Sequence, residues 1–226
     1  MNRTFDDTRR WARLSTELCL KAADAFDEPS ALPGWSRAHV AAHVAANADA
    51  LGNLVHWAAT GEPTPMYASP EERAAGIERG RALPAAELAA WLRDSADKLE
   101  SGMAALSPEQ WQVEVVTAQG RTVPATELPW MRSREVCVHA VDLANGVTFA
   151  DLPGDFLIAL VDDVVAKRAA APGPAVTVRA SATGAEWHLP GDGQPAVVSG
   201  ELHEIAAYLT GRDAGALAAP ELGPWL

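Results

Sequence analysis

Two residues with metal-binding side chains, Glu135 and His139, are four positions apart in a segment with helical periodicity. In an α-helix this spacing places both side chains on one face, with their Cβ atoms about 6 Å apart, so a carboxylate and an imidazole can reach one metal ion without bending the helix. A histidine from another helix would complete a set of two imidazoles and one carboxylate. Such a set leaves one coordination position open on a divalent ion such as zinc, which is typical of catalytic sites.

The spacing alone does not select that second histidine. His39 and His43 are themselves four apart on the helix predicted to follow Ser36, and either could face Glu135 and His139. The other histidine could support a ligand or lie on the surface. Glu–His pairs at this spacing also occur as ordinary solvated contacts on helices. The alternatives therefore stay open at this point.

Four long helices are predicted in the first two-thirds of the chain because apolar residues recur there at helical spacing. They cover about residues 4–26, 36–60, 84–106 and 125–145, and Ser36 and Gly61 suit the two ends of the second helix. A loop rich in Pro and Glu, residues 61–73, separates the second helix from the third. A short extended excursion is expected around Gln119 and Gly120. The pattern is that of a four-helix bundle over residues 1–150.

The remainder, residues 151–226, changes character. A helix over 155–168 is followed by three short β-rich runs, VTVRA, EWHL and AVVS, and by a last helix that ends at Gly211. The fold class expected for the whole chain is therefore α+β, with a small C-terminal α/β domain after a helical bundle that carries the candidate metal site.

The composition excludes several classes of protein. The 226 residues carry a formal net charge of −12 and no basic stripe, which argues against binding to nucleic acid or to an anionic membrane surface. No apolar run reaches the roughly 20 residues of a membrane-spanning helix. The N-terminal MNRTFDDTRRW lacks the apolar core of a secretory signal, so a cytoplasmic location is expected. Cys137 is about 200° around the helix from both Glu135 and His139 and should point away from the metal.

Several segments resemble the mycothiol-dependent maleylpyruvate isomerases, within the wider group of DinB-like metalloproteins. They are LPGWSRAHVAAHVAANADAL, NLVHWAATGEPTPMY, TAQGRTVPATELPWMRSREVCVHAVDL and SGELHEIAAYLTGR. The group's pattern is a histidine on the second helix and an ExxxH motif on the fourth. The resemblance implies a DinB-like bundle with a small α/β domain. It also implies zinc ligands at His43, Glu135 and His139, which favours His43 over His39.

The resemblance further implies the reaction, a cis–trans isomerisation of maleylpyruvate to fumarylpyruvate in gentisate breakdown. A carbon–carbon double bond does not rotate, so a thiolate is expected to add, allow rotation about a single bond and leave again. Zinc would deprotonate the thiol of mycothiol. Arg73 and Arg212 would bind the substrate carboxylates and stabilise the enolate. If Arg212 takes part, the C-terminal domain must fold over the bundle, with the site between the domains.

Two other functions remain as alternatives: a mycothiol S-transferase acting on other electrophiles, or a binding or regulatory module that has lost its metal. The long match through TAQGRTVP and WMRSREV favours the isomerase. A His₂Glu set also suits iron or cobalt. Asn47 and Asp142 are candidates for orienting a metal ligand. The family suggests a monomer.

Overall fold

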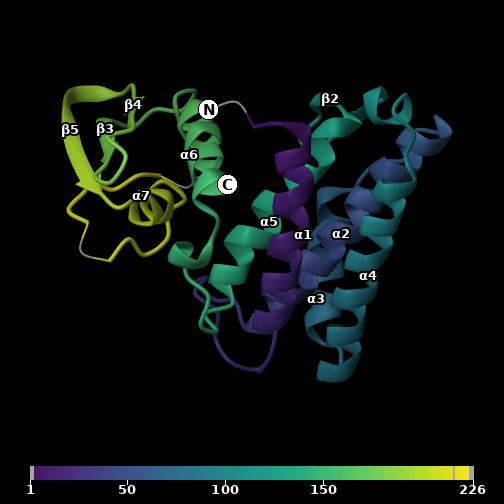
Figure 1. Ribbon diagram of the computed structural model, residues 1–226. Coiled ribbons are helices and arrows are strands. Elements are labelled where there is room, and N and C mark those ends of the chain that lie inside the picture. The colour runs from purple at the N-terminus through teal and green to yellow at the C-terminus, as the bar shows by residue number, and fades with distance from the viewer. Residues whose placement is uncertain (1–2, 216, 224–226) are drawn as a thin grey trace. The chain divides into compact units, whose positions relative to one another are not determined.

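The computed structural model describes residues 3–215 and 217–223. They divide into two compact units, the first from Thr4 to Thr148 and the second from Phe149 onward together with Arg3. The first unit is largely helical (Figure 1). Its elements in chain order are α1 (Phe5–Ala22), α2 (Arg37–Thr60), α3 (Pro70–Arg81), α4 (Ala85–Ala105), the 3₁₀ turn η1 (Gln110–Gln112), β1 (Glu114–Val116), β2 (Thr122–Pro124), η2 (Ala125–Glu127) and α5 (Leu128–Asp142).

Helix α2 is the central helix of the first unit, and it packs against α3, α4 and α5, while α1 packs mainly against α5. Its sequence explains this position, because alanine and valine recur on all its faces and most of them are buried. Gly61 ends the helix in the left-handed conformation, with a φ of 77° that costs glycine little. The two helices that carry Glu135, His139 and His43 are therefore neighbours.

The core of the first unit forms two apolar clusters at different levels along the helices. One includes Val44 of α2 and Val136 of α5, and the other includes Leu51 of α2 and Leu128 of α5. The buried polar side chains Asn47 and Arg132 lie on α2 and α5 between these levels. A polar layer thus interrupts the apolar core beside the ligand-bearing turns.

Helix α3 corrects the expectation of a loop through residue 73. The helix begins at Pro70, and the side chain of Ser69 accepts a hydrogen bond from the Glu72 backbone N–H at 3.1 Å. A serine N-cap, a proline in the first turn and acidic residues after it are established signals for a helix start. Arg73 therefore lies on a helix and not in a loop.

The connection between α4 and α5 is the expected extended excursion. Strands β1 and β2 pair antiparallel, with Val115 opposite Val123, and the turn between them contains Gly120 at a φ of 76°. The polypeptide then enters α5 through the η2 turn, so the α-helix starts at Leu128 and ends at Asp142, a shorter span than the periodicity predicts.

The second unit contains η3 (Phe149–Asp151), α6 (Gly154–Arg168), β3 (Pro174–Ala180), β4 (Glu186–Leu189), β5 (Asp192–Gly200) and α7 (Leu202–Leu209). The strand order is β4-β3-β5, with β4 antiparallel and β5 parallel to β3. Helices α6 and α7 pack against each other. The helix–three strands–helix order matches the expectation, and the α+β class is confirmed.

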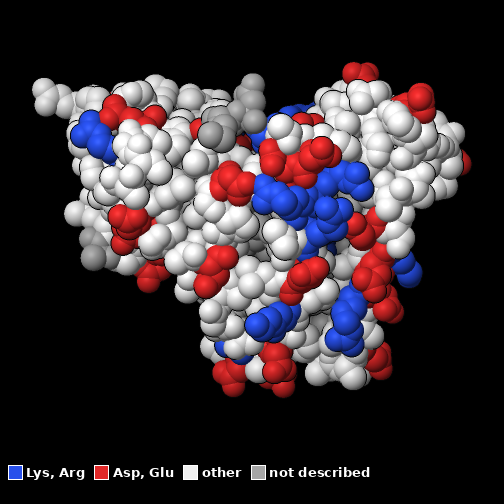
Figure 2. Space-filling model, viewed as in Figure 1, with Lys and Arg blue, Asp and Glu red and all other residues white. Residues whose placement is uncertain are grey.

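Two further properties of the structure are the hydrophobicity of its helices and the distribution of charged residues on its surface. No helix among the described residues is both long and apolar enough to cross a membrane. Figure 2 shows Lys and Arg gathered in separate groups bordered by Asp and Glu on the visible face, rather than in one continuous basic stripe.

Candidate metal centre

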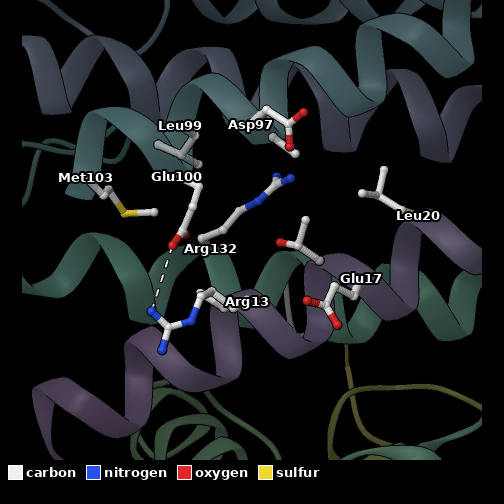
Figure 3. A pocket seen from close by; sticks show the side chains of 11 residues that line it. Arg13, Glu17, Leu20, Asp97, Leu99, Glu100, Met103 and Arg132 are labelled. Atoms are coloured by element: carbon white, nitrogen blue, oxygen red, sulfur yellow. Dashed lines mark ion pairs between the residues drawn. The ribbon is translucent and has the colours of Figure 1, made fainter. Parts of the chain in front are cut away.

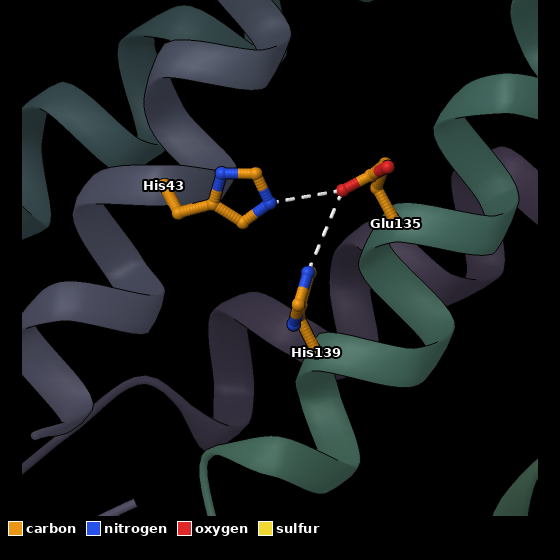
Figure 4. Close-up of side chains that lie close together, drawn as sticks. All are labelled: His43, Glu135 and His139. Atoms are coloured by element: carbon orange, nitrogen blue, oxygen red, sulfur yellow. Dashed lines mark hydrogen bonds and ion pairs between the residues drawn. The ribbon is translucent and has the colours of Figure 1, made fainter. Parts of the chain in front are cut away.

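Three side chains from α2 and α5 converge on one point. The Nε2 atom of His43 lies 3.0 Å from Oε2 of Glu135, and Nε2 of His139 lies 3.5 Å from the same oxygen. All three donor atoms lie within 4.8 Å of one another. Figure 4 shows both imidazoles directed at the Glu135 carboxylate, one from each helix. The structure therefore brings together the three residues singled out as ligands.

The donor set and its spacing fit a divalent ion. Metal–ligand bonds of roughly 2.0–2.2 Å in a tetrahedral site place neighbouring donor atoms roughly 3.3–3.6 Å apart. The separations of the Glu135 carboxylate oxygen from the two imidazole nitrogens, 3.0 and 3.5 Å, are close to this range. Three donors leave the fourth corner of such a site for a small molecule.

His39 has a different task. Its Nδ1 accepts a hydrogen bond from the Ser36 backbone N–H at 3.0 Å, which satisfies an otherwise free donor at the start of α2. Its Nε2 lies 3.8 Å from a carboxylate oxygen of Glu78 on α3. The ring also stacks on Trp35, with centroids 5.7 Å apart. His39 is thus occupied as a helix cap, one turn away from the cluster that contains His43.

Asp142 orients His139. The Oδ2 atom of this fully buried aspartate lies 2.8 Å from Nδ1 of His139. A carboxylate at Nδ1 keeps the proton on that nitrogen and leaves Nε2 with its lone pair facing the cluster. The arrangement matches the carboxylate–histidine pair that metal sites use to fix a ligand. Of the two candidates for an orienting residue, Asp142 is the one that contacts a candidate ligand, whereas Asn47 contacts Arg132.

Charges within the cluster are strongly coupled. Burial disfavours the charged form of His139, yet the carboxylates of Asp142 and Glu135 raise its pKa to about 9. Burial also opposes ionisation of Glu135, but hydrogen bonds from the two histidines hold the pKa of Glu135 well below its usual value. Burial lowers the pKa of His43 despite its hydrogen bond to Glu135. In the metal-free protein His139 is therefore protonated at neutral pH, and its positive charge partly neutralises the carboxylates of Glu135 and Asp142.

Arg73 and Tyr67 lie beside the cluster. The Nη2 atom of Arg73 is 3.3 Å from Nδ1 of His43, and its guanidinium lies 5.9 Å from the centroid of the Tyr67 ring. Burial raises the pKa of Tyr67, so its phenol stays neutral at ordinary pH. Sequence reasoning missed Tyr67 because a tyrosine in a loop rich in Pro and Glu carries no spacing signal.

The remaining candidates make hydrogen bonds to other groups. Arg212 belongs to the second unit, just after α7, and its Nη1 donates to the backbone carbonyl of Thr210 at 2.6 Å. Asn47 accepts a hydrogen bond from Arg132 at 3.0 Å rather than one from a ligand. Cys137 is fully buried, with its sulfur 2.6 Å from Oγ of Ser15, and burial raises the pKa of its thiol. A nucleophilic role for Cys137 is therefore excluded by its surroundings.

Fold and site together define an α+β protein whose helical bundle holds a partly buried set of two histidines and one glutamate. Residues 6–144 match the family described as the mycothiol maleylpyruvate isomerase N-terminal domain, and the chain belongs to this family. It is also similar to the crystal structure of a mycothiol-dependent maleylpyruvate isomerase, with 38% identity, a TM-score of 0.93, and coverage of 99% of this chain and 98% of the other. No curated protein sequence matches significantly.

A second solved structure, a mutant of a mycothiol-dependent maleylpyruvate isomerase with one histidine replaced by alanine, matches equally well. Its identity is 37% and its TM-score 0.93, again over 99% of this chain and 98% of that one. The agreement extends through both units and not only through the part that the family description covers.

Proposed function

We propose that this protein is a mycothiol-dependent maleylpyruvate isomerase that uses a divalent metal ion, zinc in the first instance, held by His43, Glu135 and His139. The observation that carries the proposal is the convergence of these three donor atoms within 4.8 Å in a chain of that family. When bound, the metal ion would supply Lewis acidity and mycothiol the nucleophilic sulfur, so no protein residue need supply a nucleophile.

The contribution of the chain at the metal is orientation and charge. Asp142 holds the proton at Nδ1 of His139 and thereby keeps Nε2 available as a ligand. Glu135 offers an ionised carboxylate because its pKa lies well below its usual value. Two neutral imidazoles and one carboxylate leave a net positive charge on a divalent ion, which favours the ionised form of a thiol placed there.

Arg73 is proposed to bind a carboxylate of the substrate. A guanidinium can only donate, so its contact with Nδ1 of His43 requires an unprotonated nitrogen there. With a metal ion held through Nε2, the neutral His43 ring would carry its proton on Nδ1, and Nδ1 could then no longer accept a hydrogen bond from Arg73. Arg73 would then be available for a substrate carboxylate, which matches the planar donor pair of a guanidinium.

Arg212 is proposed as a second arginine that binds substrate. This assignment rests on the family resemblance of the YLTGR segment, and a dianionic substrate that develops further charge on an enolate oxygen has use for two guanidinium groups. Substitution by lysine, which keeps the charge but loses the paired donors, tests the assignment separately from Arg73.

The decisive experiment combines metal analysis with an isomerisation assay. Purified protein should contain about one divalent ion per chain and should convert maleylpyruvate to fumarylpyruvate only when mycothiol is added. His43→Ala should lose both the metal and the activity. His56→Ala, on the same helix but exposed, is the matched control and should lose neither.

Three outcomes would overturn the proposal. Equal isomerisation without any thiol would exclude the thiol-dependent mechanism. A stable thioether product in place of the trans isomer would indicate an S-transferase. Retention of the metal in His43→Ala together with its loss in His39→Ala would show that the ligand set was assigned to the wrong histidine.

A further inference from the structure

A cavity of about 180 Å³ opens in the first unit between α1 and α4. Its walls include the apolar side chains of Leu20, Leu99 and Met103, and Arg132 of α5 lines it as well. Figure 3 shows Arg132 extending along the cavity between α4, which carries Asp97, and α1, which carries Glu17. None of the three candidate metal ligands lines this cavity, so it is distinct from the candidate metal centre although both include residues of α5.

Arg132 is a buried cation whose charge is not matched by a close carboxylate. Arg132 is only 2% exposed to solvent. Its Nη1 donates to the Val44 carbonyl at 2.8 Å and to Oδ1 of Asn47 at 3.0 Å. Among the described residues the guanidinium makes no ion pair within 4.0 Å and no third hydrogen bond, and the carboxylates of Glu135 and Asp49 act on it only from a greater distance. The N–H groups of Nε and Nη2 are therefore left for whatever fills the cavity that Arg132 lines.

Burial makes this an energetically demanding arrangement. It lowers the pKa of Arg132 to about 10, so the guanidinium remains charged at neutral pH while lacking full hydration. A buried charge with unused donors is costly unless an acceptor reaches it. A carboxylate is the group that best matches two neighbouring guanidinium N–H donors.

The mouth of the cavity carries the opposite charge. Glu17 and Asp97 are exposed lining residues, and neither makes an ion pair or a hydrogen bond with any residue that the structure describes. Arg13 lies 3.9 Å from Glu100 and is thereby partly neutralised. Two unpaired carboxylates repel a simple anion on its way to Arg132 but attract a ligand that also carries an ammonium group.

We propose that the cavity binds a small zwitterion of the amino-acid type, whose carboxylate meets Arg132, whose ammonium faces Glu17 and Asp97, and whose apolar body packs on Leu20, Leu99 and Met103. The volume is compatible, since an engineered cavity of about 150 Å³ holds a benzene molecule. This site is independent of the proposed isomerase activity and would stand if that proposal failed.

The test uses three compounds of matched shape: L-leucine with both charges, 4-methylpentanoate with the carboxylate alone, and 3-methylbutylamine with the ammonium alone. Each is titrated into the purified full-length protein labelled with ¹³C at the methionine methyl groups. Met103 lines the cavity, and Met66, which does not, is the internal control. L-leucine should shift the Met103 signal saturably and leave Met66 unchanged, with the other two compounds about tenfold weaker or worse.

Variants separate specific binding from solvent effects. Asp97→Asn should weaken L-leucine and improve 4-methylpentanoate, while Asp94→Asn, exposed on the same helix and outside the cavity, should change neither. Ala96→Phe and, as a milder filler, Thr16→Leu should abolish the shift in protein that keeps its native Met66 signal. Any of three outcomes would overturn the proposal: an absent or non-saturable shift, equal shifts from all three compounds, or tighter binding of 4-methylpentanoate to the unmodified protein. The first of these would mean that water alone fills the cavity.

Discussion

The carboxylate of Asp142 lies 2.8 Å from Nδ1 of His139, on the ring nitrogen opposite the one that faces Glu135. The two residues are three positions apart, at the last turn of α5, so one helix supplies two candidate ligands and the group that orients one of them. Through this pair a fully buried carboxylate contacts a candidate metal ligand, and the first of four predictions concerns it.

Replacing Asp142 should weaken metal binding more than it alters the fold. Asp142→Asn keeps an acceptor for the Nδ1 proton but loses the negative charge, whereas Asp142→Ala loses both. Losses of orienting partners typically cost 10- to 100-fold in metal affinity. We expect a loss in this range for the asparagine and a larger one for the alanine, measured by competition with a chromophoric chelator. Unchanged affinity in both variants would show that Asp142 is only a structural partner.

Arg73 should act on substrate binding and on turnover. Arg73→Lys keeps a positive charge but cannot present two parallel donors, so KM for maleylpyruvate should rise by about tenfold or more. Arg73→Ala should in addition lower kcat if the guanidinium stabilises the enolate. Arg79→Ala is the control, because Arg79 is on the same helix and pairs with Glu72 rather than with the cluster. Metal content should be the same in all three variants.

Gly80 should be required for the close packing of α3 against α2 and α4. A Cβ atom there would lie 2.5 Å from Cζ3 of Trp91 and 2.8 Å from Cβ of Ala42, both too close for contact. We expect Gly80→Ala to lower the free energy of unfolding by about 1–3 kcal/mol, as overpacked cores do. Gly76→Ala, where the nearest atom is 3.9 Å away, should instead raise it by up to about 1 kcal/mol through helix propensity. Thermal and urea unfolding of the two variants measure the difference.

The stability of the metal-free protein should fall between about pH 6.5 and 9. The pKa of His139 is raised from 6.5 to about 9 in the folded state, so the folded protein binds a proton in this range that the unfolded chain releases. The contribution is fully present below pH 6.5 and is lost as the pH rises through 9, and it amounts to about 3 kcal/mol.

A variant isolates this effect from other titrating groups. His139→Gln in the metal-free state should show a flatter dependence than the unmodified metal-free protein over the same interval, measured by urea unfolding at each pH. Parallel curves for the two proteins would contradict a protonated His139. The pKa of His43 is lowered and not raised, so its contribution falls below this interval.

Sequence periodicity was sufficient for elements whose formation is decided locally. Local sequence is enough to predict the spacing of Glu135 and His139 on α5 and the helix start at Ser36. It is also enough to predict that three strands follow one another along the C-terminal part of the chain. The choice between His39 and His43 is different, because it depends on which side of α2 faces α5. The residue pattern left that choice open, the family resemblance favoured His43, and the geometry joins His43 to the cluster.

Two features of the site depended on contacts that the sequence alone does not encode locally. Tyr67 reaches Arg73 only because the segment before α3 returns toward the bundle. The unpaired donors of Arg132 become visible only when α1, α4 and α5 are packed around it. Ser69 and Pro70 mark the start of α3 in the sequence, but the prolines and glutamates around them favour a loop equally, so the sequence pattern does not predict this helix.

The helix that carries Arg73, α3, is more exposed than the two helices that carry the candidate metal ligands, and it therefore tolerates more substitutions. The candidate metal ligands are anchored on α2 and α5, whose side chains are mostly internal, whereas α3 buries only Ile77 and Gly80 and leaves most of its surface to solvent. Mutations at the exposed positions of α3, away from Ile77 and Gly80, can therefore accumulate at little cost to folding. If the three residues bind an ion as proposed, a lineage of such proteins could alter which anionic molecules it accepts, through Arg73 and its neighbours, while inheriting the same set of candidate ligands.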